Sequence, residues 1–471
     1  MKLSIRRATA LLSAFTLLML SGAAMATNGY FTHGVGTESK GMAGTGVGSD
    51  AANGPIIVAT NPALGVFTSD SWELGLGAFS TMRSYKASSS LALGSGGAFT
   101  IGPGNYDSSS ELFPIPYIAK SWSLDNGLAI SALFYGRGGM NTDWDDPNAT
   151  AFFDPTGMGG IGVEFPGTYG NGDAGVDLSQ AFLAINFAGK AGDNFAWGIG
   201  PVFAVQSFEA KGLMNFMPFT KTFNDCFFGM PPGTCDPTPG SLTNNGHDVS
   251  TGFGGAVGIW WSMGNAVSAG LSYQSKMSMG DLEDYSDLYA EAGGFDIPST
   301  AKFGISFKGD DVRLNLDIEH TEFSDVSSVG NPMVNMFNCP FAVFQFTGMP
   351  GGDTESCLGG KNGPGFGWED MTTYKLGFEW TPGDTMAWRL GYSYGEQPIQ
   401  EADVLFNILA PGVMEQHFTL GWTISKPNGC AWNYSLMYAP SKKVTGPNLF
   451  DPTQTIQIEM RQLEFEFSYL W

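Results

Sequence analysis

The chain ends on the stretch Leu463-Glu464-Phe465-Glu466-Phe467-Ser468-Tyr469-Leu470-Trp471, in which every odd position carries a large apolar residue and most even positions carry a polar one. Successive side chains of a strand point to opposite faces, so this pattern gives one apolar and one polar face. Such a strand, ending on an aromatic residue, is typical of a bacterial outer-membrane β-barrel, where one face meets lipid and the other meets the lumen. The sequence therefore predicts an all-β fold.

The start of the chain has the features of a signal peptide. A basic region at residues 2–7 precedes an apolar run at residues 8–20 and Ala24-Met25-Ala26, which matches a signal peptidase site. We expect residues 1–26 to be removed during export and Thr27 to be the mature N-terminus of an outer-membrane protein.

The composition favours a membrane protein that crosses the bilayer with strands. Hydrophobic residues make up 43% of the chain and charged residues only 14%, whereas soluble proteins contain about 25% charged residues. After the signal peptide, no apolar run approaches the length of about 20 residues that a membrane helix needs. Only helices and closed barrels satisfy their backbone hydrogen bonds in lipid, so the spanning segments must be strands of a barrel.

The formal charge of −23 bears on the partners of the protein. It argues against nucleic acid, because that affinity comes mainly from Lys and Arg contacts with phosphates. In a barrel, acidic outer loops and lumen rims account for such a charge. The expected partners are outer-membrane lipid, lipopolysaccharide and the barrel assembly machinery, and we expect a monomer.

Alternating segments about 10 residues long recur along the chain, and this is the length at which a tilted strand crosses the apolar layer. About fourteen of them are expected, an even number as in bacterial single-chain barrels. The expected strands are 72–86, 112–123, 127–140, 175–187, 195–210, 249–262, 266–280, 297–308, 311–323, 368–381, 385–397, 414–425, 430–440 and 456–471.

The connections alternate between short and long, which predicts the orientation of the barrel. Tight turns rich in Asn, Asp and Gly are expected on the periplasmic side, at 125–127, 192–194, 264–265, 309–310, 382–384 and 427–429. Longer links rich in Pro and Gly are expected as outer loops, at 141–174, 211–248, 281–296, 324–367, 398–413 and 441–455.

Residues 27–70 differ from the rest, because glycine and small residues dominate and no alternation persists for the length of a strand. Such a segment could be a flexible linker. Tyr30, Phe31 and the apolar run 56–58 give it side chains to bury, so we expect a compact plug followed by a barrel over residues 71–471.

The third expected strand ends in Gly136-Arg137-Gly138-Gly139. Glycine inside a strand weakens it and often marks a bulge or a bend. Gly136, Gly138 and Gly139 could therefore open a gap in the barrel wall, or they could simply begin the outer loop. Composition alone favours neither interpretation.

The loop 211–248 is unusually apolar for an outer loop. Exposed apolar patches usually mark binding sites, and Met and Phe suit an adaptable binding surface. The competing interpretation is packing within the loop, held by a Cys226–Cys235 disulfide. The residues that could form a hydrophobic capture site are Phe216, Phe219, Phe223, Phe227, Phe228 and Met230.

The cysteines suit an oxidising compartment. Cys226 and Cys235 share one expected loop and Cys339 and Cys357 share another, so two local disulfides are the simplest pairing. Spacing alone leaves other connectivities open. Cys430 remains as a free thiol beside a periplasmic turn.

Several motifs, taken in order along the mature chain, resemble the FadL/TodX family of outer-membrane transporters of long-chain fatty acids and hydrocarbons. Asn61-Pro62-Ala63 is the most specific of them. The resemblance implies a 14-stranded barrel whose lumen is closed by an N-terminal hatch. It also implies capture of the ligand by a groove among outer loops, an apolar lumen pocket and sideways release at a kink in the third strand. The other motifs are 28–31, 34–36, 40–44, 270–276, 297–298, 368–370, 389–394 and 397–399.

The substrate class stays open between long-chain fatty acids, which we favour, and aromatic or aliphatic hydrocarbons. A carboxylate would need Arg or Lys in an otherwise apolar pocket, whereas a hydrocarbon would not. The candidate cations are Arg137, Lys211, Lys302 and Lys375.

Other classes of function lack their sequence signals. A lipid hydrolase needs a nucleophile oriented by histidine, but the four histidines, at 33, 247, 320 and 417, are isolated from any nucleophile motif. A general porin would not carry a plug and an apolar loop. The glycine-rich 34–48 lacks a P-loop Lys-Ser/Thr, and the acidic run 281–287 lacks EF-hand spacing. We therefore expect no catalysis, cofactor or metal.

Overall fold

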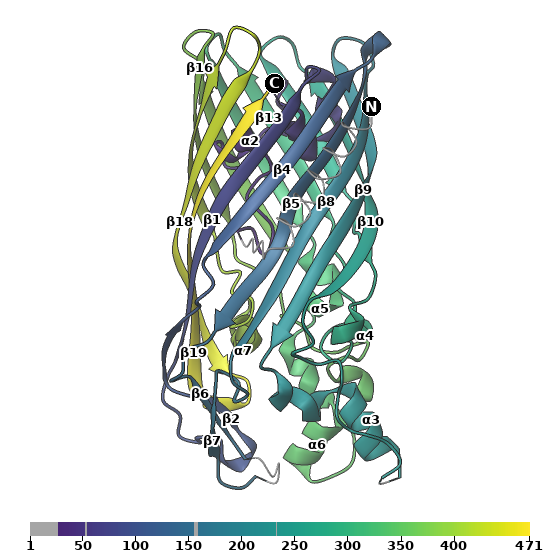
Figure 1. Cartoon of the computed structure of the whole chain (residues 1–471), viewed down its shortest axis with the longest axis vertical. Coiled ribbons are helices and arrows are strands. Elements are labelled where there is room, and N and C mark those ends of the chain that lie inside the picture. Colours follow the sequence, from purple (N-terminus) through teal and green to yellow (C-terminus); the bar gives the residue numbers. More distant parts are fainter. Residues whose placement is uncertain (1–26, 52–53, 155–158, 232) are drawn as a thin grey trace, which may run out of the picture.

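The computed structural model describes residues 27–51, 54–154, 159–231 and 233–471. The expected signal peptide lies outside these residues. Fourteen antiparallel strands form a closed barrel, in which β19 pairs with β1 and β10 pairs with β11 (Figure 1). The barrel strands are β1 (Trp72–Ala87), β4 (Leu112–Ser123), β5 (Leu128–Trp144), β8 (Ala174–Lys190), β9 (Phe195–Lys211), β10 (Asp248–Ser262), β11 (Val267–Gln274), β13 (Thr300–Lys308), β14 (Val312–Thr321), β15 (Met371–Trp380), β16 (Met386–Gly395), β17 (Gln416–Ser425), β18 (Ala431–Asn448) and β19 (Asp451–Leu470). The predicted all-β barrel of about fourteen strands is confirmed.

The terminal strand β19 has the two faces that its alternation predicts. Leu463 and Phe465 point outward and are 49% and 39% exposed, whereas Glu464 and Glu466 point into the lumen and are almost fully buried. Near the short turns, Trp72 and Trp471 stack with ring centroids 6.5 Å apart, as part of the aromatic belt that a barrel places at a membrane interface. In the described part of the chain, no helix is long and apolar enough to cross a membrane.

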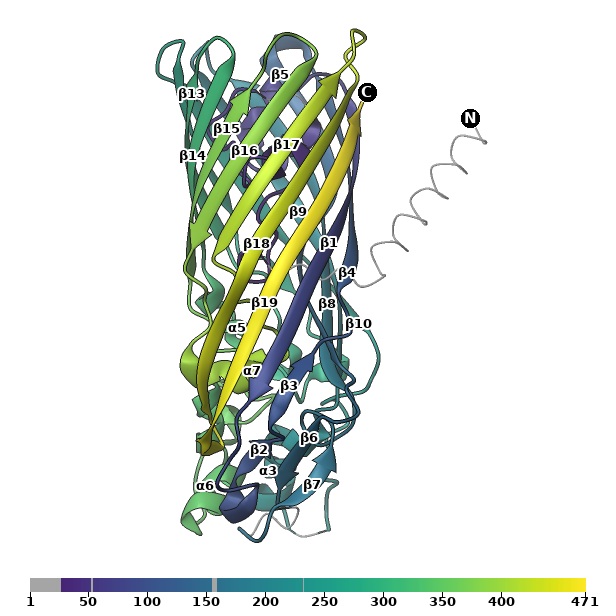
Figure 2. The same ribbon diagram turned by 90° about the vertical axis from the view of Figure 1, so that its left-hand side faces the viewer.

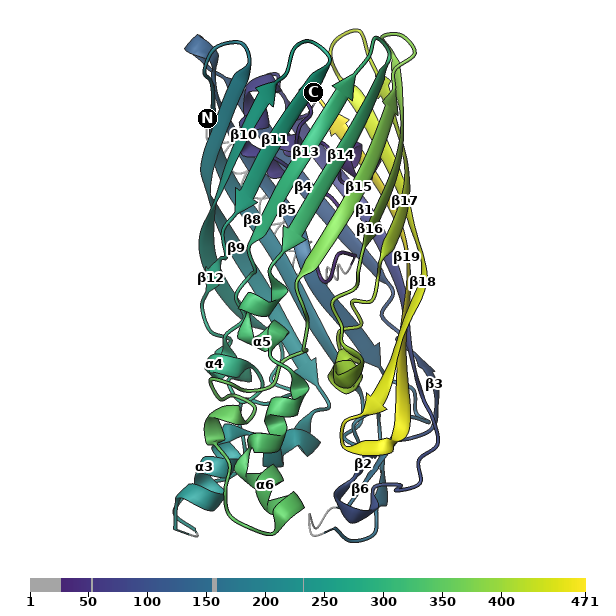
Figure 3. The ribbon, with the colours of Figure 1, turned by 180° about the vertical axis from the view of Figure 1, so that it is seen from behind.

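The two ends of the barrel differ (Figures 1 and 3). Short turns join the strands at one end, and long segments with helices and a small sheet extend from the other. Figure 2 shows this small sheet below β1 and β3. The additional elements at this end are β2 (Phe99–Ile101), β3 (Gly104–Asp107), β6 (Thr150–Phe153), β7 (Val163–Pro166), β12 (Ser278–Met279), α3 (Lys221–Gly229), α4 (Ala290–Gly293), α5 (Ser327–Gly330), α6 (Pro340–Thr347) and α7 (Val404–Asn407). Short 3-10 helices there are η3 (Ser95–Gly97), η5 (Met214–Phe219), η6 (Glu283–Tyr285), η7 (Phe323–Asp325), η8 (Met333–Asn338), η9 (Thr354–Ser356) and η10 (Glu401–Asp403), and η4 (Asp125–Gly127) lies in a short turn.

The prediction of an outer loop at residues 441–455 is wrong. β18 and β19 continue through it as a long hairpin joined by a two-residue turn. The prolines that suggested a loop lie beside two register shifts, between Ala439 and Lys442 and between Pro447 and Asn448. Bulges are positions where a strand tolerates proline, so the hairpin keeps its ladder on either side. The expected strand 266–280 is too long, because β11 ends at Gln274.

Residues 27–51 and 54–71 form a hatch inside the barrel, with α2 (Thr37–Lys40), η1 (Pro55–Ala59) and η2 (Pro62–Phe67). Inward-facing glycines of the wall let the hatch backbone approach closely. A Cβ atom at Gly198, Gly270 or Gly391 would lie 2.2, 2.2 or 2.3 Å from hatch backbone atoms. This close approach is a physical reason for glycine inside these strands.

Polar contacts fasten the hatch to the wall. Lys40 Nζ lies 2.5 Å from Glu464 and 2.6 Å from Glu466, both on β19. The Asp317 carboxylate of β14 accepts hydrogen bonds from two hatch amides, at 2.7 and 3.0 Å. Asn61 Nδ2 donates to Val47 O at 2.8 Å and to Ile259 O of β10 at 3.1 Å, so this side chain links the hatch to the wall.

We expect Lys40→Met to destabilise the closed hatch. The substitution leaves two buried carboxylates without their cation, and removing one partner of a buried ion pair costs about 3–5 kcal/mol. Thermal unfolding in detergent should start at a lower temperature, and steady ion conductance in planar bilayers should rise. Adding Glu464→Gln and Glu466→Gln should restore much of the stability.

Lys442→Met is the matched control, because Lys442 makes an exposed ion pair with Glu415 at 2.7 Å. Exposed pairs contribute about 0–1 kcal/mol, so this variant should behave like the wild type. Equal unfolding temperature and conductance for Lys40→Met and Lys442→Met would show that the Lys40 pair does not hold the hatch.

Candidate functional site

The hydrogen-bond ladder between β4 and β5 is interrupted on the side of the long loops. Pairing ends at Tyr117–Tyr135. Beyond this point β4 pairs only with β1, and β5 diverges from it (Figure 1). The interruption ends where Ser109 N donates to Asp143 O at 2.9 Å. Between these two limits, residues 136–142 of β5 have no partner on β4.

The glycine cluster lies at this interruption, within β5 and not at its end. The register with β8 shifts between Gly136 and Gly138, so Arg137 is the additional residue of a bulge. The interpretation that these glycines begin the outer loop is therefore wrong, because the strand continues to Trp144. A bulge bends its strand and increases the local twist, which is the physical reason why β5 leaves β4.

The N-terminal part of the hatch occupies the edge of β5 that β4 leaves free. Thr32 N donates to Arg137 O and Gly139 N donates to Tyr30 O, each at 2.9 Å, around a bridge between Phe31 and Gly138. Unpaired backbone groups are costly inside a membrane. The hatch therefore satisfies two of the backbone groups that the interruption would leave free.

Arg137 extends from this bulge into a small cavity of about 30 Å³ between the hatch and the wall. Its guanidinium donates to Gln274 Oε1 at 2.6 Å and to Thr300 Oγ1 at 2.9 Å, and it stacks on Phe31 at 4.4 Å. No carboxylate in the described part of the chain forms an ion pair with it. Arg137 is 5% exposed, so it is a buried cation that forms no ion pair of its own.

The three candidate lysines lie in different surroundings. Lys302 lines the same cavity as Arg137, 3.5 Å from Glu319. Lys375 is bound to Glu319 at 2.7 Å and donates to His33 O of the hatch at 2.9 Å. Lys211 lies at the rim, 45% exposed and 3.8 Å from Glu209. The structure thus brings Arg137 and Lys302 together, uses Lys375 to hold the hatch and places Lys211 outside the lumen.

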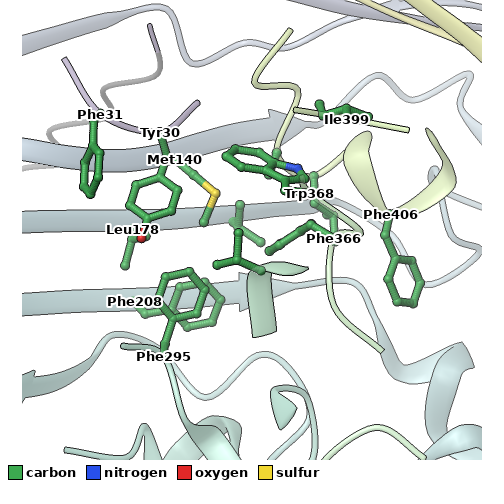
Figure 4. Packing of buried hydrophobic residues seen from close by; sticks show 14 of the residues in the cluster. Tyr30, Phe31, Met140, Leu178, Phe208, Phe295, Phe366, Trp368, Ile399 and Phe406 are labelled. Carbon is green, nitrogen blue, oxygen red and sulfur yellow. The ribbon is translucent and has the colours of Figure 1, made fainter. Parts of the chain in front are cut away.

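An apolar interior extends between the outer loops and the interruption (Figure 4). Tyr30 of the hatch contacts Phe323 and Trp368, with ring centroids 5.3 and 5.9 Å apart. Closer to the loops lies a small apolar cavity of about 30 Å³, whose lining includes Val176, Leu213, Phe216, Tyr289, Phe406 and Leu409. All of these residues belong to one continuous cluster of buried hydrophobic residues.

The apolar loop 211–248 packs against the loop that contains α6. Phe219 and Phe223 contact Phe341 with ring centroids 5.4 and 5.8 Å apart, and Phe228 contacts Phe344 at 5.9 Å. Each loop is closed by a disulfide, Cys226–Cys235 in one and Cys339–Cys357 in the other. These aromatic contacts join two loops, whereas the second interpretation expected packing within loop 211–248.

Part of the same region remains exposed. Phe227 and Met230 are 62% and 52% exposed, next to Phe344 and Phe346, which are 45% and 53% exposed on α6. Phe227 contacts Phe223 at 5.4 Å, and Phe223 continues through Phe341 to Phe219. We call this set, from Phe227 to Phe219, the aromatic path, because it links the surface to the packed interior of the loops.

Cys430 is unpaired beside a short turn.

Two histidines are not isolated in space. His33 of the hatch stacks on His417 of β17 at 5.7 Å, and Ser393 Oγ lies 3.0 Å from His417 Nδ1. Burial and the nearby Lys40 and Lys375 ammonium groups hold the pKa of His33 well below its usual range. His417 Nε2 has no partner among the described residues, so no acidic group orients this ring as in a Ser-His-Asp triad. No group of His, Cys, Asp and Glu in the described ranges is placed to hold a metal ion.

No protein-family model and no curated protein match the sequence. Solved structures do match. The Pseudomonas putida toluene transporter TodX is 15% identical, with a TM-score of 0.60, over 93% of this chain and 98% of that chain. A Pseudomonas aeruginosa FadL homologue is 15% identical, with a TM-score of 0.60, over 94% and 99%. The Ralstonia pickettii toluene transporter TbuX is 13% identical, with a TM-score of 0.52, over 92% and 98%.

The chain has the fold of the FadL/TodX channels. The predicted resemblance is thereby confirmed at the level of the fold, and the barrel is of the outer-membrane type. At these identities the match defines the architecture alone, so the roles of individual residues must be argued from this structure.

A gap at the glycine cluster was one of the two interpretations of the sequence, but a second signal for it, on β4, was not used. Pro114 and Pro116 lie in β4 on the side that has no β5 partner. Proline cannot donate to a ladder and is tolerated at strand edges. Two prolines within three residues of an otherwise alternating strand therefore indicate a free edge.

We expect the double variant Phe227→Ser and Phe228→Ser to weaken the binding of a fluorescent long-chain fatty acid to the purified protein. A buried Phe contact contributes about 1.5–3 kcal/mol, so partial loss of two contacts should lower affinity about tenfold. Leu91→Ser is the matched control, since Leu91 is 91% exposed on another outer segment. Equal affinity for both variants and the wild type would exclude capture at the aromatic path.

Proposed function

We propose that the protein is an outer-membrane channel for the passive uptake of hydrophobic compounds, and that its substrates are long-chain fatty acids. The observation that carries the proposal is the continuous apolar interior, which begins at the exposed Phe and Met side chains and ends at the ladder interruption above a closed hatch. A water-filled porin would instead need an open polar lumen.

The proposed route has three steps. A ligand first contacts the exposed Phe227 and Met230, then enters the apolar cavity beside Phe216, and then reaches the cavity beside Arg137. Each step exchanges contact with water for contact with apolar side chains, which is favourable without an energy source. Flexible Met and Phe side chains tolerate ligands of varied shape.

Sideways release is the proposed last step. The hatch contacts the wall through backbone approach at glycines and through buried ion pairs, so a path through it would break many contacts at once. At the interruption, side chains and two hydrogen bonds to the hatch are the contacts that close the wall among the described residues. A ligand that leaves there enters lipid directly and does not have to be released into water.

The uncompensated Arg137 favours a carboxylate substrate. A buried cation without an ion pair is costly, and Lys302, which lies 3.5 Å from Glu319, lines the same cavity. A fatty acid would place its carboxylate beside these groups and its chain in the apolar interior. The alternative substrate is a hydrocarbon. The aromatic lining also suits a hydrocarbon, and two of the structural neighbours are described as toluene transporters.

The substrate class is tested with Arg137→Met and two ligands of equal chain length, palmitate and hexadecane. A hydrogen bond to a charged group contributes about 1.5–3 kcal/mol, so Arg137→Met should weaken palmitate binding about 10- to 100-fold. Hexadecane binding should not change. Lys211→Met is the matched control, because it removes a cation at the exposed rim. Equal effects of Arg137→Met on both ligands would favour hydrocarbons as substrates.

Sideways release is tested with Gly139→Val. Gly139 has a negative φ, and valine keeps the N–H group that bonds to Tyr30 O, so the hatch contact can form. The added side chain fills the interruption, and we expect palmitate uptake into cells to fall several-fold while binding to the purified protein persists. Gly255→Val on β10 is the control, because a Cβ there has its nearest atom 3.8 Å away. Wild-type uptake by Gly139→Val at equal surface expression would argue for passage through the hatch.

A further inference from the structure

Arg83 on β1 lies beside the ladder interruption. Its carbonyl accepts a hydrogen bond from Ser108 N at 2.9 Å, and its guanidinium donates to Ser110 O at 3.3 Å and to the Thr81 hydroxyl. The guanidinium also lies 5.4 Å from the centre of the Phe113 ring. Residues 108–113 form the β4 side of the interruption and its outer limit, so Arg83 lines the interruption from the lumen.

The buried arginines fall into two groups. Arg313 pairs with Asp50 at 2.7 Å and Arg389 pairs with Glu379 at 2.8 Å, and both belong to the contacts around the hatch. Arg83 and Arg137 are 4% and 5% exposed, and in the described ranges neither has a carboxylate within 4.0 Å. The two buried arginines that form no ion pair within 4.0 Å are therefore the two that flank the interruption.

The bonding capacity of Arg83 is largely unused. Both of its hydrogen bonds come from one terminal nitrogen, and its Nε is buried without a partner. A guanidinium has five N–H donors in a planar fork that matches a carboxylate. Contact with one aromatic ring and one carbonyl offsets only part of the cost of burying this charge. The guanidinium therefore has donors free for a carboxylate.

We infer that Arg83 is a second carboxylate-binding residue, which receives the head group of the transported molecule at the wall interruption after it leaves Arg137. The inference rests on the proposed function, because it requires a carboxylate substrate. An ionised carboxylate that moved from Arg137 into the apolar wall would lose its counterion, at a high cost in a medium of low dielectric constant. A guanidinium on the other side of the interruption removes this barrier, so Arg83 acts on delivery and Arg137 acts on binding.

The test compares delivery of palmitate and hexadecanol into vesicles that contain the full-length protein. The two ligands share a chain length and differ in the charge of the head group. Arg83→Met keeps an unbranched side chain and removes the charge, whereas Arg83→Lys restores it. Arg461→Met is the matched control. Arg461 lies on β19, opposite Met82 of β1, and its side chain is exposed on the outer face. Gel mobility before and after heating checks that each barrel is folded.

We expect Arg83→Met to slow palmitate delivery about tenfold, the effect of losing one charge-assisted contact, and to leave hexadecanol delivery unchanged. Equilibrium binding of palmitate should stay within about twofold of the wild type, since Arg137 is intact, and Arg83→Lys should recover most of the palmitate rate. Arg461→Met should deliver both ligands normally.

Two results would overturn the inference alone: equal slowing of palmitate and hexadecanol by Arg83→Met, which shows a structural role, or unchanged delivery of both. Delivery of hexadecanol but not palmitate by the wild type would overturn the carboxylate substrate and the inference with it. Delivery of neither ligand by the wild type would overturn the proposed function itself.

Discussion

The ion pairs between Lys40 of the hatch and Glu464 and Glu466 of β19 are the contacts on which the other features depend. They join the hatch to the last strand, across 424 and 426 residues. Because both carboxylates are buried, their charge is balanced only while the hatch is seated. A seated hatch closes the lumen on the side of the short turns, and any ligand that enters from the loops must then leave by another way.

The hatch and the ladder interruption support each other. A strand edge that faces lipid without partners would be costly, and the bulge at Arg137 creates such an edge on β5. The hatch segment around Phe31 supplies hydrogen bonds to this edge, and in return it gains a fixed position against the wall. The same bulge turns Arg137 into the lumen, so one local irregularity both weakens the wall and places a cation in the cavity beside it.

The distribution of counterions separates structural charges from those available to a ligand. Lys40, Lys375, Arg313 and Arg389 are matched by carboxylates and hold the hatch or its surroundings. Arg137 and Arg83 are not matched, although burial makes an unpaired charge expensive. Fold similarity could not have made this distinction, since it does not extend to individual side chains at the identities found. The distinction comes from which charged side chains form ion pairs in this structure.

The sequence by itself determined the features that depend on local periodicity and composition. The alternation over residues 463–471 predicted a lipid face and a lumen face, and the short and long connections predicted which end carries the loops. The resemblance of the N-terminal motifs predicted the hatch. Proline and glycine near residues 440–447 were misread as a loop because bulges in a long hairpin require the same residue types.

Only the tertiary structure decided the register of the strands, the free edge of β5 and the partner of each buried charge. These depend on contacts between residues far apart in the chain, such as Lys40 with Glu464 or Arg137 with Thr300. A local pattern states that a residue is charged or that a strand contains glycine. Whether that charge is neutralised, and whether that glycine lies in a bulge or under the hatch, is set by the element that folds against it.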